Sequence, residues 1–325
     1  MSDDQGAAAK DLILSTGPHV YTSTDVPKIM YGVIIALIPA SVMGIYLFGW
    51  GALKVIVVSV LFAMLSEGAI QFAVGRPVSM LDGSAAVTGL LLALNVPPTS
   101  PWWMVLIGAV VAIIIGKQIY GGLGHNPFNP ALVARVVLLV SWPLQMTQWI
   151  APLDGVSTAT PLGILKAEGI AKLGGVRLFD LFIGNVGGCI GEVSAIALLI
   201  GFAYLLWKGY VTWHIPVSYM GTVFVFTGIF WMANPQKYAN PLFHLLAGGL
   251  VLGACFMATD YVTSPMTLKG QVIFGMGCGI LTCVIRLFGG YPEGVSFSIL
   301  LMNAATPLID QYTKPKRYGR VKQNA

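Results

Sequence analysis

The segment from Asp154 to Pro161 holds the densest set of groups that could take part in chemistry. It reads Asp154-Gly155-Val156-Ser157-Thr158-Ala159-Thr160-Pro161. A threonine hydroxyl is a weak nucleophile near neutral pH unless a base or a metal activates it, and this stretch holds no histidine, lysine or cysteine. Catalysis by the threonines alone is therefore not expected. The segment is either an ordinary turn or the substrate of another enzyme, which its small residues would suit.

A second candidate is the pair Asn126 and Asn129. Asn129 followed by Pro130 is typical of the cap and first residue of a helix, so a capped helix start is one interpretation. The alternative is that both side-chain amides, close to free helix N–H groups, hydrogen-bond a neutral polar ring.

Several charged residues lie in or beside apolar stretches, where a charge at membrane depth is costly and suggests a function. They are Glu67, Asp82, Lys117, Arg135, Glu192, Asp260 and Arg286. Most are expected near the ends of spans, where long side chains reach the surface. Glu67 is the exception, because it falls well inside a predicted span. We predict that it pairs with Arg135 or forms part of an ion path.

The cysteines and histidines do not suggest a metal centre. The cysteines form no Cys-x-x-Cys pair, and three scattered histidines have no helix-spaced acidic or cysteine partner. These residues are Cys189, Cys255, Cys278, Cys283, His125, His214 and His244. We expect structural side chains rather than ligands of zinc or of an iron–sulfur cluster.

The elements that position these groups are predicted to be membrane helices. Of 325 residues, 56% are hydrophobic and 10% are charged, whereas a soluble domain carries about 25% charged residues. Lipid must therefore form part of the solvent of this chain. The basic residues after position 310 are expected to face anionic lipid rather than nucleic acid.

Ten apolar stretches, in two groups of five, are candidates for spans. They cover 28–48, 51–74, 83–96, 102–120 and 129–146, and then 186–207, 212–232, 241–258, 268–287 and 292–309. The third is short enough for a broken or re-entrant helix. Residues 147–185 between the groups are polar, and a loop of this length is usually functional or a linker.

Short sequence motifs of the first group of apolar stretches recur in the second group. Thr99-Ser100-Pro101 recurs as Thr263-Ser264-Pro265, and Gly121-Gly122 recurs as Gly289-Gly290. An odd number of spans per repeat inverts the second copy across the membrane. We therefore predict an all-α polytopic membrane protein of about ten helices in two inverted five-helix repeats. Its parts are an N-terminal segment 1–27, a first repeat 28–146, a loop 147–185, a second repeat 186–309 and a basic tail 310–325.

The basic residues also predict the orientation. If the N-terminus is cytoplasmic, most of the 18 lysines and arginines lie on the inner side, as the positive-inside rule requires. Both termini are then cytoplasmic, and residues 147–185 lie outside. Residues 1–27 lack the apolar core of a cleavable signal.

Residues 154–160 resemble the flavinylation motif of the family that joins the D subunit of Rnf complexes to the B subunit of sodium-pumping NADH:quinone reductase. That motif has Asp, two variable residues, Ser or Thr, usually Gly, and then Ala-Thr. The resemblance implies that Thr160 carries covalent FMN through a phosphoester installed by a flavin transferase. It makes Asp154, Ser157 and Ala159 recognition positions, while Thr158 stands where the family usually has glycine.

Other motifs extend the resemblance over most of the chain. They are residues 121–132, residues 290–294 with Asn303 and Pro307, and residues 15–19. The resemblance further implies a urea-transporter-like fold and a non-covalent riboflavin at Asn126 and Asn129.

The implied function is electron relay in a translocase of the bacterial inner membrane, as one part of a complex rather than a complete enzyme. Electrons would pass between ferredoxin and NAD, coupled to the movement of Na⁺ or H⁺. The implied partners are the A, B, C, E and G subunits of the Rnf complex, the flavin transferase and the lipid bilayer. Three alternatives remain. One is the B subunit of the quinone reductase, which a quinone-reduction assay would separate. Another is a flavin-free solute channel, which would leave residues 147–185 unexplained. The third is a purely structural subunit, in which removal of residues 147–185 would leave electron transfer intact.

Overall fold

The computed structural model describes residues 25–175, 177–192 and 194–314. The motif at residues 15–19 and most of the basic tail lie outside the described residues. The first group of elements is α1 (Val26–Phe48), α2 (Trp50–Ala73), α3 (Ser84–Leu94), α4 (Trp102–Ile113), the π-helical turn η1 (Ile114–Gln118), α5 (Pro130–Ser141) and α6 (Pro143–Met146). The last group is α9 (Ala195–Trp207), α10 (His214–Ala233), α11 (Pro241–Leu246), α12 (Leu250–Leu252), the π-helical turn η3 (Gly253–Met257), α13 (Leu268–Phe288) and α14 (Val295–Thr313).

The described residues are mostly helical, as predicted, with a single pair of two-residue strands. Among the described residues, four helices are long and apolar enough to cross a membrane: α1, α2, α10 and α13. Shorter apolar helices, α3, α4 with η1, α5 and α9, pack beside them. A large apolar surface stays exposed on the long helices, as expected where lipid is the solvent.

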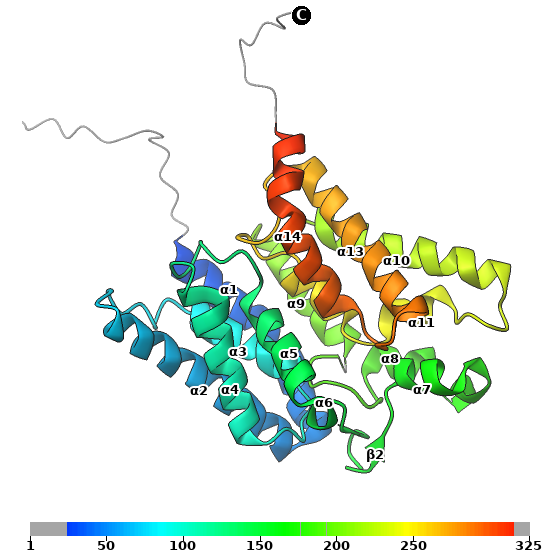
Figure 1. Ribbon diagram of the computed structural model, residues 1–325. Helices are drawn as coiled ribbons and strands as arrows, with labels where there is room; N and C mark the ends of the chain where they lie inside the picture. The colour runs from blue at the N-terminus through cyan, green and yellow to red at the C-terminus, as the bar shows by residue number, and fades with distance from the viewer. Residues whose placement is uncertain (1–24, 176, 193, 315–325) are drawn as a thin grey trace, which may run out of the picture.

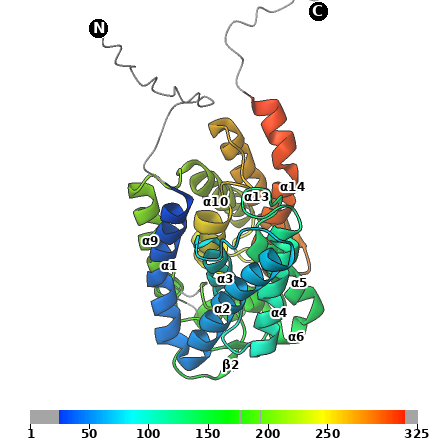
Figure 2. The ribbon, with the colours of Figure 1, turned by 90° about the vertical axis from the view of Figure 1, so that its left-hand side faces the viewer.

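The helices form two packed groups (Figure 1). In one, α2 packs against α3 and α4, and α4 packs against α5. In the other, α10 packs against α11 and α13, and α13 packs against α14. The groups meet where α1 packs against α9 and α5 packs against α14. Residue 25 and the end of α14 lie at one end of the molecule, and β2 and α6 lie at the opposite end in both views (Figures 1 and 2).

Residues 147–185 fold into small elements of their own. They hold the antiparallel pair β1 (Trp149–Ile150) and β2 (Ser157–Thr158), then α7 (Pro161–Glu168), the 3₁₀ turn η2 (Ile170–Gly175) and α8 (Leu178–Ile183). Leu162 and Leu181 from this segment pack with Phe243 and Ala247 of the last group. The segment therefore rests on the membrane helices through an apolar contact.

The broken span is the eighth, not the third. The third predicted span is the short but continuous helix α3, whereas residues 241–258 are interrupted between α11 and α12, where Gly248 has a φ of +74°. The guanidinium of Arg286 satisfies the break by donating to the carbonyls of His244, at 2.5 Å, and Ala247, at 3.1 Å. Irregular backbone at membrane depth is tolerated where protein groups bond it in this way.

The sixth predicted span also begins later than expected, at Ala195 instead of 186. Residues 185–192 form turns that bond to the chain just after α3. The N–H of Gly191 donates to the carbonyl of Leu94 at 2.7 Å, and the N–H of Ile190 donates to that of Val96 at 3.4 Å. This contact carries Glu192 into the core, where it is buried.

The helices α10 and α13 approach closely because α13 presents glycines to α10. A Cβ atom on Gly279 would lie 2.6 Å from Cβ of Thr222 and 3.0 Å from the carbonyl oxygen of Tyr219.

We expect Gly279→Val to lower the stability of the folded protein by about 1–3 kcal/mol through overpacking. A lower midpoint of thermal unfolding in detergent would report this. Gly221→Val on α10, where nothing lies within 4 Å of an added Cβ atom, is the matched control. Equal midpoints for the two variants would contradict the close contact.

Candidate functional site

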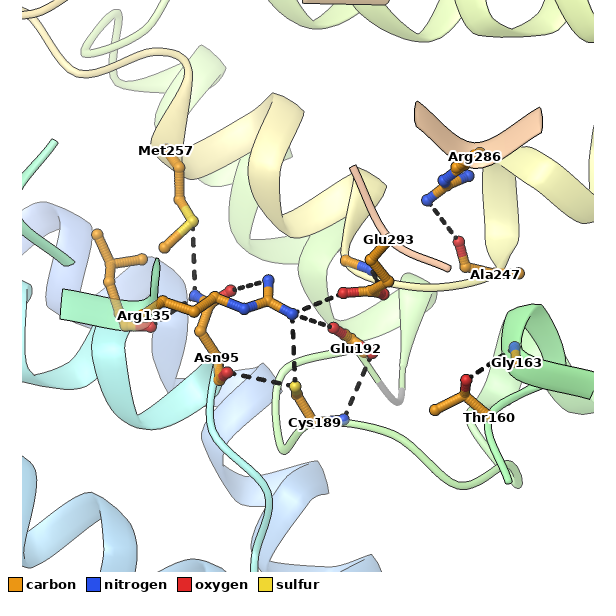
Figure 3. A network of polar contacts seen from close by, with 12 residues as sticks. Asn95, Arg135, Thr160, Gly163, Cys189, Glu192, Ala247, Met257, Arg286 and Glu293 are labelled. Atoms are coloured by element: carbon orange, nitrogen blue, oxygen red, sulfur yellow. Dashed lines mark hydrogen bonds and ion pairs between the residues drawn. The ribbon is translucent and has the colours of Figure 1, made fainter. Parts of the chain in front are cut away.

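The centre of the molecule holds a buried arginine between two glutamates. Arg135 comes from α5, Glu192 from the turn before α9, and Glu293 from the loop between α13 and α14. Nη2 of Arg135 lies 2.6 Å from Glu293 and 3.3 Å from Glu192, while Nη1 donates to the side chain of Asn95 at 2.9 Å (Figure 3). The cluster joins both groups of helices. It therefore ties them together by charge as well as by packing.

A second arginine lies beside this cluster. A Cβ on Gly248 would collide with Oε1 of Glu293 and lie 3.2 Å from Nη2 of Arg286. Oε1 of Glu293 also accepts from the N–H of Gly249 at 3.0 Å. Positive and negative side chains thus alternate from Arg286 through Glu293 and Arg135 to Glu192.

Glu67 pairs with Lys117 and not with Arg135, so the first of the two alternatives predicted for Glu67 is wrong. Its Oε1 accepts from Nζ of Lys117 at 2.6 Å and from Nε2 of Gln118 at 2.8 Å. Lys117 also donates to Oγ of Ser84 at 2.6 Å. The two charged side chains are only 1% and 2% exposed. The π turn η1 explains the pairing, because it turns Gly116, Lys117 and Gln118 inward together.

Thr160 lies at the start of α7, on the side of the Arg135 cluster where Glu192 lies (Figure 3). Its Oγ1 accepts a hydrogen bond from the N–H of Gly163 at 3.0 Å, so the side chain caps the helix. The preceding residues Asp154–Ser157 and Ala159 are exposed, as expected, but Thr160 itself is only 9% exposed. The hydroxyl borders a cavity of about 10 Å³ that Glu192 also lines. Such a volume holds about one water molecule.

Lys166 fixes α7 to the end of α13. Its ammonium donates to the carbonyls of Tyr291 at 2.7 Å, Ile285 at 3.4 Å and Arg286 at 3.5 Å. A cation at the C-terminal end of a helix is favourable because it meets free carbonyls. Partial burial lowers the pKa of Lys166 from its usual value. The helix that carries Thr160 is thereby held against the loop that carries Glu293.

Asn126 and Asn129 border a different cavity, of about 100 Å³. Asn129 caps α5, accepting from the N–H groups of Ala131 at 3.1 Å and Leu132 at 3.3 Å, as the capped-start interpretation predicts. Its amide nitrogen also donates to the carbonyl of Met257 at 3.2 Å. The cavity has apolar walls, and its polar lining residues are Ser84, Thr88, Lys117, Asn126, Asn129, Thr259 and Asp260 with Tyr210 and Tyr261.

The fold and these sites define a polytopic membrane protein with two separate candidate sites. Residues 13–319 match the family described as NQR2, RnfD, RnfE. The chain belongs to this family.

Its relatives include bacterial proteins of similar length. The chain is 49% identical over 316 residues to the D subunit of the proton-translocating ferredoxin:NAD(+) oxidoreductase complex of Clostridium ljungdahlii, covering 94% of this chain and 96% of the relative. It is 48% identical over 316 residues to the D subunit of the Na(+)-translocating ferredoxin:NAD(+) oxidoreductase complex of Acetobacterium woodii, covering 96% of each. With apolar spanning helices and bacterial relatives, the protein is a bacterial membrane protein.

The structure separates the two predicted groups of site residues and adds others. Thr160 lines one cavity, and Asn126 with Asn129 lines the other. Lys117, Arg135, Glu192 and Arg286, expected at span ends, are instead buried with partners. A signal for them existed in the sequence. Four acidic and three basic residues occur in or beside apolar stretches, and buried charges are usually paired with opposite charges.

The Arg135 cluster allows a test by double substitution. Arg135→Met should destabilise the protein by about 3–5 kcal/mol, because two buried carboxylates lose their shared cation. Adding Glu293→Gln should recover part of this loss in the thermal midpoint. Lys172→Met, which breaks an exposed pair with Glu168, is the control and should cost less than about 1 kcal/mol. Strictly additive losses in the double variant would mean that the pair does not interact.

Proposed function

We propose that this chain is the D subunit of an Rnf-type ferredoxin:NAD oxidoreductase, in which it relays electrons coupled to the translocation of Na⁺ or H⁺. Identity of 48–49% to two such proteins over nearly their whole lengths supports this function. The observation that carries the electron-relay role is Thr160, the last residue of the flavinylation motif, at the N-terminus of α7. The chain would work as one part of a larger complex.

The surroundings of Thr160 suit FMN attached through its phosphate. In the first turn of α7, Pro161 has no N–H and the N–H groups of Gly163 and Ile164 already donate to Thr160. The N–H of Leu162 and the positive end of the helix dipole would favour a phosphoester anion. The cavity beside Thr160 has room for about one water molecule, so the flavin ring would lie outside it. Leu153 and Val156, shortly before Thr160 in the sequence, are apolar and 67% and 64% exposed. Together with a partner protein, these side chains would cover one face of the flavin ring.

The test of this site is peptide mass spectrometry on chain made with the flavin transferase. We expect the peptide containing Thr160 to gain the mass of FMN less water, and Thr160→Ala to lack it. Thr158→Ala is the matched control, because it removes a neighbouring hydroxyl and should keep the flavin. An unmodified wild-type peptide in the presence of active transferase would rule out the covalent site and leave the chain without the predicted relay group.

We propose a second, non-covalent flavin in the cavity beside Asn126 and Asn129. Met30, Val33, Leu91 and Phe256 provide apolar contacts there, and the amides and hydroxyls provide donors and acceptors. This combination suits a neutral ring system with a polar edge. Riboflavin supplies electron-carrying chemistry when bound, and the chain supplies its position.

Extraction of non-covalent flavin tests this second site. Asn126→Ala with Asn129→Ala should lower the riboflavin content at least tenfold, because the ring loses its amide partners. Asn240→Ala is the control: Asn240 caps α11 and also precedes a proline, but it does not line the cavity. Equal riboflavin in all three proteins would remove the asparagines from the site.

The finer topology belongs to the same proposal. We infer ten membrane-crossing segments in two inverted repeats, because the packing of α2, α4 and α5 is matched by that of α10, α13 and α14. Both described ends of the chain lie opposite the segment with β2 (Figure 2), which supports cytoplasmic termini and an external Thr160.

The A, B, C, E and G subunits of the Rnf complex would surround the chain in the inner membrane. Glu67, predicted on an ion path, stays a candidate for that role.

A further inference from the structure

The cavity beside Asn126 and Asn129 is bordered by both π-helical turns of the described chain. Lys117 belongs to η1, and Phe256 belongs to η3. Such turns cost helix regularity and are frequent at functional sites. Here they bring a charged side chain and an aromatic side chain to one cavity from different groups of helices.

Lys117 is the cation of this cavity. Among its described lining residues only Lys117 and Asp260 carry charges. An ammonium has three N–H donors, and Lys117 uses two of them, on Glu67 and Ser84. The third remains for an acceptor in the cavity.

Glu67 lies behind Lys117 and does not line the cavity. Its Oε1 accepts from Lys117 and Gln118, whereas Oε2 is buried without a hydrogen-bond partner. The pair is therefore a buried dipole with its positive end towards the cavity. In surroundings of low polarity such a dipole acts strongly on a charge that develops nearby.

Two carboxylates near Lys117, those of Asp82 and Asp260, also act on any charge in the cavity. Asp82 accepts from Oγ of Ser84 at 2.6 Å and is partly exposed to solvent. Asp260 accepts from the N–H of Val262 at 3.4 Å and the hydroxyl of Thr263 at 3.3 Å. Both carboxylates disfavour an added negative charge in the cavity. The ammonium of Lys117 at the cavity wall favours such a charge.

We propose that Lys117 fixes the redox potential of the electron carrier in this cavity, with Glu67 as its counter-charge. The inference rests on the proposed riboflavin site and adds the residue that tunes it. The carrier takes electrons from the preceding group of the complex and passes them to the next. Lys117 forms no covalent bond and exchanges no electron; its ammonium stabilises the charge that the carrier gains. It is a positioning and electrostatic residue, not a catalytic one.

The test compares two substitutions that predict opposite shifts. Full-length chain with Thr160→Ala would be purified in lipid nanodiscs with riboflavin bound, so that the non-covalent flavin alone is titrated. Lys117→Met removes the cation, and the reduced flavin should lose at least tenfold in affinity relative to the oxidised flavin. This loss lowers the midpoint potential by about 30 mV for a two-electron couple. Glu67→Gln leaves the cation uncompensated and should raise the potential.

Controls separate this effect from damage to the fold. Lys117→Arg keeps the charge and should stay close to the parent potential, and Lys54→Met removes an exposed lysine of α2 and should change nothing. If Lys117→Met does not assemble, the sign of the shift in Glu67→Gln decides. Unchanged potentials, or shifts of the same sign in both variants, would overturn the role of Lys117 and leave the riboflavin site standing. A parent chain that retains no riboflavin would overturn the site and this role together.

Discussion

In a membrane protein, each buried charge and each backbone group left unbonded by a break in a helix needs a partner within the protein, because lipid supplies none. The described part of this protein meets the constraint by crossing between elements that are far apart in sequence. Arg135 of α5 pairs with glutamates from the two segments that lead into α9 and α14, and Arg286 of α13 bonds the carbonyls where α11 ends. The close packing of the two helix groups and the broken helix both depend on these contacts.

The same constraint explains why the candidate sites lie where they do. Around Thr160 the backbone is irregular, and its helix is held by Lys166 against free carbonyls of the α13–α14 region. Around Asn126 and Asn129, two π turns and the capped start of α5 surround a cavity. Each site occurs where regular helix stops, because a continuous helix leaves no backbone donors free. The Arg135 cluster lies between the two helix groups, and its Glu192 borders the cavity beside Thr160.

The long helices could be predicted from the sequence because apolar length alone determines them. The predicted limits of α1, α2, α10 and α13 fall within two residues of those observed. The breaks depend on partners that a single stretch does not reveal. Whether 241–258 forms one helix is decided by Arg286 from another element. Likewise, the sequence does not show which cation pairs with Glu67, because the pairing with Lys117 depends on the inward turn of η1.

The motif around Thr160 shows both the reach of sequence reasoning and its limit. The spacing from Asp154 to Thr160 predicts Thr160 as a modified residue without any structure. It does not reveal that the hydroxyl caps a helix, since capping depends on where α7 begins. Asn129 was easier, because a following proline is a strong sign of a helix start.

The cap on α7 sets an order of events for any enzyme that modifies Thr160. Most residues just before Thr160 are exposed and accessible to an enzyme. The side chain of Thr160 is buried, and its hydroxyl accepts a hydrogen bond from the N–H of Gly163. The first turn of α7 must open before that oxygen can react. If Thr160 is the attachment residue proposed above, a newly made chain whose segment does not yet rest on the α13–α14 loop would be a better substrate than the folded protein. Closure of α7 after the reaction would then keep water from the new bond.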